Sequence, residues 1–189
     1  ILCGEGIRID DPQYEDGIMA ALPGCVSKGT MILPTFVPGT GPFAGASGAW
    51  LNPPQNPIER AAAVALYVGL LTDFALARVG ARGTIMIDGR FARAKAFVSV
   101  LACLRADHHI YAARQEADLA LGAMSLLSPT LSVQGSLELI KPDPLDLSGY
   151  RTRWLEASGE KGPSARRSAA PSRRTATSRL IPAPHAARP

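Results

Sequence analysis

The stretch TIMIDGRFARAKAF (residues 84–97) decides the fold, because it changes from a strand pattern to a helix pattern. β-Branched and apolar residues come first, Gly89 follows, and an alanine-rich basic segment ends the stretch. A glycine after a buried strand lets a ligand approach the backbone, and a helix start offers free N–H groups to a phosphate or ribose oxygen. The same turn can also serve only to reverse the chain, since every strand–helix unit needs one.

The residues that follow repeat this alternation. Strand patterns are TIMID and HHIYAA, and helix patterns are ARAKAFVSVLACLRA and EADLALGAMSLLS. Strands and helices that alternate with short connections predict an α/β layer with parallel strands. Beyond them, residues 131–147 predict a short strand or edge element, and a last helical turn is expected near Tyr150 and Trp154.

The residues upstream begin with loops and end in a long helix. Residues 1–55 are rich in turn formers, with a short strand predicted at ILPTF (32–36), and the glycines and prolines of residues 37–57 exclude a helix. Asn56 then provides a helix cap, followed by proline at the first helical position and by Glu59, which can reach back to the cap. The uncharged run 61–72 is shorter than the roughly 20 residues that a bilayer requires, so a buried core helix is expected and no membrane contact.

Charge divides the chain into two parts. Residues 159–189 carry 7 Lys+Arg and 1 Glu, whereas residues 1–158 carry 13 Lys+Arg and 15 Asp+Glu, so the overall charge of +4 comes from the tail. The tail is arginine, serine, alanine and proline, which bury too little apolar area to offset the entropy of ordering. We therefore expect a folded domain over residues 1–157 and a basic disordered tail over 158–189. The tail lacks interleaved aromatic residues, so nucleic-acid binding is not expected.

The cysteines indicate the cellular compartment, and the first residue indicates whether the chain is a whole protein. Cys3, Cys25 and Cys103 are widely spaced and suit free thiols in a reducing cytosol, so a cytoplasmic protein is expected. The chain starts on an isoleucine without a signal-peptide pattern, and the missing methionine suggests a piece of a longer protein.

The order of these segments resembles the C-terminal domain of the FGGY carbohydrate kinases. A long buried helix beginning near Glu59, a strand, the element Asp-Gly-Arg-Phe-Ala-Arg at 88–93, an amphipathic helix, a strand and Leu121-Gly122-Ala123 follow one another as in that family. The segment LPTFVPGTGPFAGASGAW (33–50) is similar to the loop of the L-fuculokinase and xylulokinase subgroup. The resemblance covers roughly residues 31–154 and implies an α/β, ribonuclease-H-like (actin-like ATPase) fold.

The resemblance implies a function in sugar phosphorylation. FGGY kinases transfer the γ-phosphate of ATP, bound with Mg²⁺, to a sugar hydroxyl, and Gly89 would lie against the adenine or ribose. The sugar and the catalytic aspartate would belong to an N-terminal domain absent here, so no catalytic or metal-binding residue is assigned and the fragment is expected to be inactive. The implied cofactor-binding residues are Gly89, Arg90, Phe91, Arg93, Gly122 and Ala123.

The alternative is a non-catalytic αβ binding or structural module that has lost nucleotide binding. Arg90 stands where the family often has a second glycine, and Ala94 stands where an asparagine often opens the next helix. Both changes remove usual features of the nucleotide site.

Other polar residues are weaker candidates. Gly39-Thr40-Gly41 lacks the lysine of a P-loop and is interpreted as a structural turn. His108 and His109 point to opposite faces of a strand, so they do not chelate one metal together. The pairs Asp10-Asp11 and Asp143/Asp146 are expected on the solvated surface. Asp73 interrupts the apolar helix, and a neighbouring loop N–H is expected to satisfy it, with a cleft-facing position as the alternative.

Overall fold

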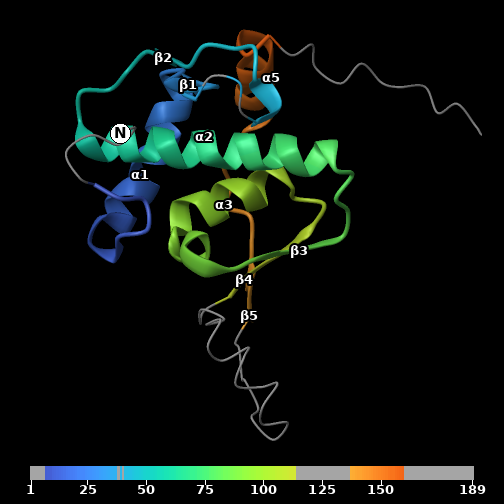
Figure 1. Cartoon of the computed structure of the whole chain (residues 1–189). Coiled ribbons are helices and arrows are strands. Elements are labelled where there is room, and N and C mark those ends of the chain that lie inside the picture. The colour runs from blue at the N-terminus through green and yellow to red at the C-terminus, as the bar shows by residue number, and fades with distance from the viewer. Residues whose placement is uncertain (1–6, 38, 40, 114–136, 160–189) are drawn as a thin grey trace, which may run out of the picture.

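The long helix α2 (Pro57–Arg78) lies at the centre of the fold, with the other elements arranged around it (Figure 1). The computed structural model describes residues 7–37, 39, 41–113 and 137–159. In chain order the elements are η1 (Pro12–Tyr14), α1 (Glu15–Ser27), β1 (Met31–Leu33), η2 (Gly41–Phe43), β2 (Ala49–Leu51), α2 (Pro57–Arg78), β3 (Thr84–Ile87), η3 (Gly89–Arg93), α3 (Lys95–Leu104), β4 (His109–Ala113), β5 (Leu137–Ile140) and α5 (Ser148–Ala157).

Helix α2 begins where the sequence predicts. The Asn56 side chain accepts a hydrogen bond from the N–H of Ile58 at 2.8 Å, and Pro57 is the first helical residue. Glu59, expected to reach back to this cap, forms an ion pair with Lys28 at 2.8 Å instead. That contact joins the start of α2 to the end of α1.

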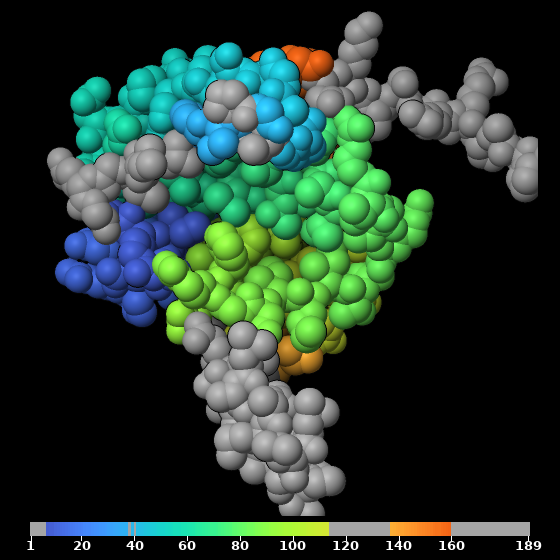
Figure 2. Space-filling model, viewed as in Figure 1, coloured from blue at the N-terminus to red at the C-terminus, as the bar shows by residue number. Residues whose placement is uncertain are grey.

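Burial identifies α2 as the core helix expected from the sequence. By length and composition it could cross a membrane, but 61% of its most apolar window is buried inside the protein. Helices α1 and α3 pack against it, and Figure 2 shows the segment that follows β1, in cyan, covering another part. The apolar side chains of α2 thus pack against neighbouring elements of the same chain.

Helix α1 lies in the N-terminal segment that the sequence predicts to be loop-rich, so the prediction was wrong there. A proline and two glycines lie within its thirteen residues, and these residues normally indicate turns. Packing outweighs them, because Ile18, Leu22 and Cys25 lie at helical spacing and are buried in the main core. Local composition misled because the helix depends on its contact with α2.

Two small sheets flank the central helix. Strands β1 and β2 pair antiparallel, with Ile32 opposite Trp50, and β1 confirms the short strand predicted nearby. The second sheet has the order β3-β4-β5, with β3 and β4 parallel and β5 antiparallel to β4. The predicted strand–helix–strand unit and edge element are therefore confirmed, and the described residues form a mixed α/β fold.

The C-terminal helix α5 closes the main core, as the sequence predicts. Its Trp154 is 1% exposed and packs edge-on against Phe43 at 5.4 Å between ring centroids. The indole Nε1 donates a hydrogen bond to the carbonyl of Ile32 at 2.8 Å, and the Tyr150 hydroxyl donates to the carbonyl of Thr30. These buried polar tips fix α5 against β1.

Asp73 is buried in α2 and is neutralised by two arginines, so the expected loop N–H is not its partner. Its Oδ1 lies 2.9 Å from Arg105 Nε, and its Oδ2 accepts a hydrogen bond from Arg151 Nε at 2.7 Å. Arg105 Nη2 also donates to the Asp73 carbonyl at 2.9 Å. One carboxylate thereby links α2 to the end of α3 and to α5.

Candidate functional site

The candidate site is the turn between β3 and α3. Gly89 has a φ of +69°, a value that side chains disfavour, and a Cβ added there would meet no atom of the described residues within 4 Å. Asp88 stabilises the turn because its Oδ1 accepts a hydrogen bond from the Gly89 N–H at 2.7 Å. The space beside the glycine is therefore open, as a backbone–ligand contact requires.

The helix after this turn starts later than the sequence predicts. Residues 89–93 form the 3-10 helix η3, and the α-helix α3 begins only at Lys95. Ala94 occupies the cap position, and no side chain there hydrogen-bonds to the first turn. The start of α3 consequently lacks the side-chain cap that satisfies N–H groups in many helices.

Arg90 is held by a carboxylate from the beginning of the chain. Its Nε lies 3.3 Å from Asp10 Oδ2, and the same carboxylate accepts two hydrogen bonds from Arg8, at 2.6 and 3.0 Å. The hydrogen bond from Arg8 is the main cause that holds the pKa of Asp10 at about 2, with burial opposing it and Arg90 assisting. Asp10 was expected on the solvated surface, but its side chain is only 10% exposed, so that expectation was wrong.

Phe91 presents an aromatic ring at the same place. It is 53% exposed and contacts Phe97 of α3 in an edge-on arrangement, with ring centroids 5.5 Å apart. A cavity of about 290 Å³ lies here. Its lining residues are Ile9, Asp10, Arg90, Phe91 and Ala94.

The structure thus brings together only part of the predicted site. Gly89, Arg90 and Phe91 share one turn, and Arg93 ends the same 3-10 helix with an exposed side chain. Gly122 and Ala123 lie outside the described residues. Sequence reasoning missed the role of Asp10, because its partner Arg90 is 80 positions away and no local pattern joins them.

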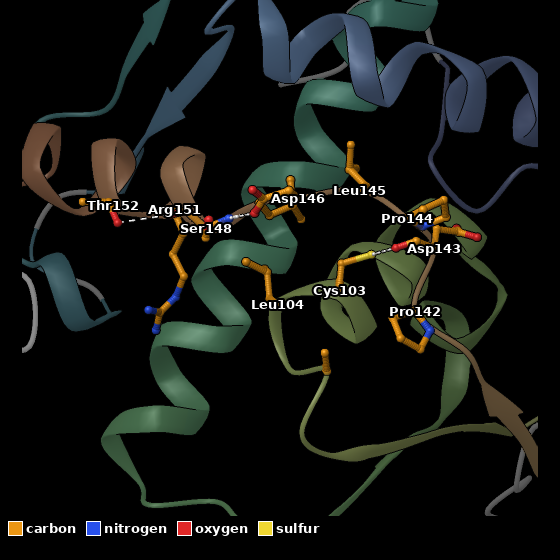
Figure 3. A pocket seen from close by; sticks show the side chains of 12 residues that line it. Cys103, Leu104, Pro142, Asp143, Pro144, Leu145, Asp146, Ser148, Arg151 and Thr152 are labelled. Carbon is orange, nitrogen blue, oxygen red and sulfur yellow. Dashed lines mark hydrogen bonds between the residues drawn. The ribbon is translucent and has the colours of Figure 1, made fainter.

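A second cavity, of about 660 Å³, lies at the other end of α3 (Figure 3). Cys103 donates to the carbonyl of Asp143 at 3.3 Å, and Asp146 accepts from the N–H of Ser148 at 2.8 Å at the start of α5. Both carboxylates are exposed, as expected. A helix of ten residues is about 15 Å long, so this cavity is remote from Gly89.

The other glycines and histidines considered from the sequence lie in turns or at the start of a strand, or contact neighbouring side chains. Gly39 lies before η2 and Gly41 is the first residue of η2, and both have a positive φ. His108 contacts Asp107 at 2.7 Å and Arg105 at 3.3 Å, and His109 lies exposed at the start of β4. Among the described residues, no three His, Cys, Asp or Glu side chains gather as a metal site would require.

Comparisons with known proteins agree on a family. The model of the carbohydrate kinase FGGY C-terminal domain matches residues 1–135. Among solved structures, the chain is similar to a carbohydrate kinase from Novosphingobium aromaticivorans, with 39% identity and a TM-score of 0.75. The match covers 84% of this chain and 34% of that kinase, so the chain spans about a third of its length. No curated protein matches the chain.

Proposed function

Because the chain belongs to the FGGY carbohydrate kinase family, whose C-terminal domain it matches, we propose that it is the ATP-binding half of a sugar kinase. The reaction proposed for the whole kinase is transfer of the γ-phosphate of ATP to a sugar hydroxyl. We further propose that the α/β fold is of the ribonuclease-H-like, actin-like ATPase type. The L-fuculokinase or xylulokinase subgroup and a cytoplasmic location stay predictions.

The observation that carries the proposal is the open turn at Gly89. The glycine has a φ of +69° and free space where a side chain would project, and the turn is followed at once by the exposed ring of Phe91. Close backbone approach and an aromatic surface are features that suit a nucleoside. The adjoining cavity of about 290 Å³ is at the lower limit of ligand pockets, which span roughly 300–1,000 Å³. It therefore suits the nucleoside part of ATP better than the whole nucleotide.

Charge around the turn suits the phosphate part. Arg90, Arg93 and Lys95 follow Gly89 within one short segment, and α3 begins there without a side-chain cap. Arg90 is paired with Asp10 at 3.3 Å and Lys95 with Glu15 at 2.9 Å, so a phosphate would share these cations with carboxylates. A helix start with uncapped N–H groups favours an anion. Mg²⁺ normally reaches such sites held by phosphates and one or two carboxylates, and we assign no described side chain to it.

The sugar and the groups that act on it are proposed to come from the rest of the kinase. The chain spans about a third of the solved kinase, and phosphoryl transfer requires a base beside the accepting hydroxyl as well as stabilised phosphates. We therefore propose that this chain binds nucleotide but does not turn over by itself.

A titration with nucleotide tests the proposal. Thermal unfolding of the full chain is followed as Mg-ATP is raised to millimolar concentration, with Mg²⁺ alone as the control. Binding at a hundred times the dissociation constant adds about 2.7 kcal/mol to the free energy of unfolding, which raises the melting temperature. If the melting temperature stays at its value in Mg²⁺ alone, the non-catalytic module becomes the better interpretation.

A further inference from the structure

Asp10 joins the beginning of the chain to the candidate nucleotide turn. It lies just before η1, and its carboxylate is nearly covered, with 10% of the side chain exposed. Arg8 holds it through two hydrogen bonds, at 3.0 Å to Oδ1 and 2.6 Å to Oδ2. Arg90 approaches the same carboxylate at 3.3 Å from the opposite segment. The carboxylate is therefore fixed in place mainly by Arg8.

This carboxylate also lines the cavity beside the turn, together with Arg90 and Phe91. The contacts described above occupy Oδ1 once and Oδ2 twice. A carboxylate offers about four acceptor positions in total, and these arginine contacts use three of them. The cavity thus combines an apolar ring, a guanidinium and a fixed acceptor within a volume of about 290 Å³.

The carboxylate of Asp10 and the guanidinium of Arg90 favour different parts of a ligand. A carboxylate repels phosphate but accepts hydrogen bonds from hydroxyl and amino groups, which a nucleoside carries on its ribose and base. The same carboxylate pairs with Arg90 and so weakens the attraction of this arginine for a free anion. Asp10 should therefore favour the neutral part of a nucleotide and disfavour inorganic polyphosphate.

We propose that Asp10 is a specificity-determining residue of this cavity, where its carboxylate accepts a hydrogen bond from a nucleoside and restrains Arg90. The inference rests on the proposed nucleotide-binding function and adds the residue that selects a nucleoside over a bare phosphate chain. Under this proposal Asp10, in the N-terminal segment, takes part in ligand binding.

Two probes of opposite character test the role of Asp10. Adenosine and inorganic tripolyphosphate are titrated separately into the full chain by calorimetry. Asp10→Asn keeps the size of the side chain and removes its charge. We expect adenosine affinity to fall about tenfold, the size of one hydrogen bond to a charged group, and tripolyphosphate affinity to stay equal or to rise. Asp11→Asn, at the neighbouring carboxylate that caps η1, should change neither affinity more than about twofold.

A second variant keeps the test decisive if Asp10→Asn folds poorly. Arg90→Gln leaves Asp10 held by Arg8 but changes the lining of the cavity, so tripolyphosphate affinity should fall by a larger factor than adenosine affinity. Equal loss of both affinities in Asp10→Asn, or unchanged adenosine affinity, would overturn the role of Asp10 and leave the nucleotide proposal standing. If the unmodified chain binds neither adenosine nor Mg-ATP, the proposed function itself is overturned, and this inference with it.

Discussion

Arg151 donates a hydrogen bond from Nε to Oδ2 of Asp73 at 2.7 Å, which joins α5 to α2 across 78 positions of sequence. The Asp73 side chain is 4% exposed, and Arg105, also nearly covered, lies 2.9 Å from its other oxygen. Two guanidinium groups, one buried and one half-buried, thus share the carboxylate of Asp73 as their ion-pair partner. Loss of the Asp73 carboxylate should therefore destabilise the fold, because the arginine charges would stay in surroundings of low polarity.

Replacing Asp73 by alanine should therefore destabilise the fold strongly. Breaking a buried ion pair from one side costs about 3–5 kcal/mol, because Arg105 would remain buried without its carboxylate partner. Arg151→Ala should cost less, since its side chain is a third exposed and Asp73 keeps Arg105. Urea denaturation gives the free energies of unfolding. The exposed neighbour Arg153 is the control, and Arg153→Ala should stay within about 0.5 kcal/mol. Equal losses for Asp73→Ala and Arg153→Ala would contradict the assignment.

Gly69 allows α2 and α3 to approach closely. A Cβ added there would lie 2.4 Å from Cγ1 of Val100, a branched side chain that is fully buried. Gly69→Ala should therefore cost about 1–3 kcal/mol through overpacking. Gly24 in α1 is the matched control, because its added Cβ has no neighbour within 4 Å among the described residues. Gly24→Ala should stabilise by about 0.5–1 kcal/mol, and a loss at both glycines would show that helix contact is not the cause.

The parts of the fold that the sequence predicted are those whose signals are local. The start of α2 depends on Asn56 and Pro57, which act within one turn, and the unit from β3 to β4 depends on alternating apolar patterns. Helix α1 was missed for the opposite reason. Its own glycines and proline indicate turns, and the buried contacts that form it come from α2, more than thirty residues away.

The same distinction applies to the candidate site. Gly89 is recognisable because a strand, a glycine and a helix follow one another, and the structure adds the positive φ. The partner of Arg90 was not recognisable, since Asp10 lies 80 positions earlier in a polar segment that looks like surface. Asp73 stood out as a charge in an apolar helix, yet its arginine partners lie far along the chain. Sequence patterns locate unusual residues more readily than they identify distant partners.

Residues 160–189 should contribute nothing to the stability of the domain. Their composition is basic and poor in large apolar residues, and α5 already ends with its own cap, where Gly159 donates to the carbonyl of Glu156 at 3.1 Å. Removing residues 160–189 should leave the melting temperature unchanged at moderate salt. A clear drop in the melting temperature would show that the segment packs on the domain.

Asp10 should make the free energy of unfolding depend on pH in the acidic range. Its hydrogen bonds, first of all from Arg8, hold its pKa at about 2, below the ordinary 3.8. A carboxyl group with a lowered pKa contributes stability above its ordinary pKa and loses that contribution as the pH falls through its folded value. The stability difference between the unmodified chain and Asp10→Asn should thus be largest above about pH 5 and shrink towards pH 2. Urea midpoints measured across this range check it, and a difference independent of pH would exclude the ion pair as its source.

Gly89 and Gly41 separate nucleotide binding from backbone strain. Both glycines have a positive φ, +69° and +68°, and in the part of the chain that the structure describes nothing lies within 4 Å of an added Cβ at either position. Valine at either place should cost a similar 1–2 kcal/mol or so of stability, because side chains disfavour this conformation. Only Gly89→Val places a branched side chain in the proposed nucleotide turn, so Mg-ATP affinity should fall more than tenfold there and stay near normal in Gly41→Val. Calorimetric titration of both variants measures the two affinities. If Gly41→Val loses affinity and Gly89→Val does not, the nucleotide binds at the start of η2 and not at the turn after β3.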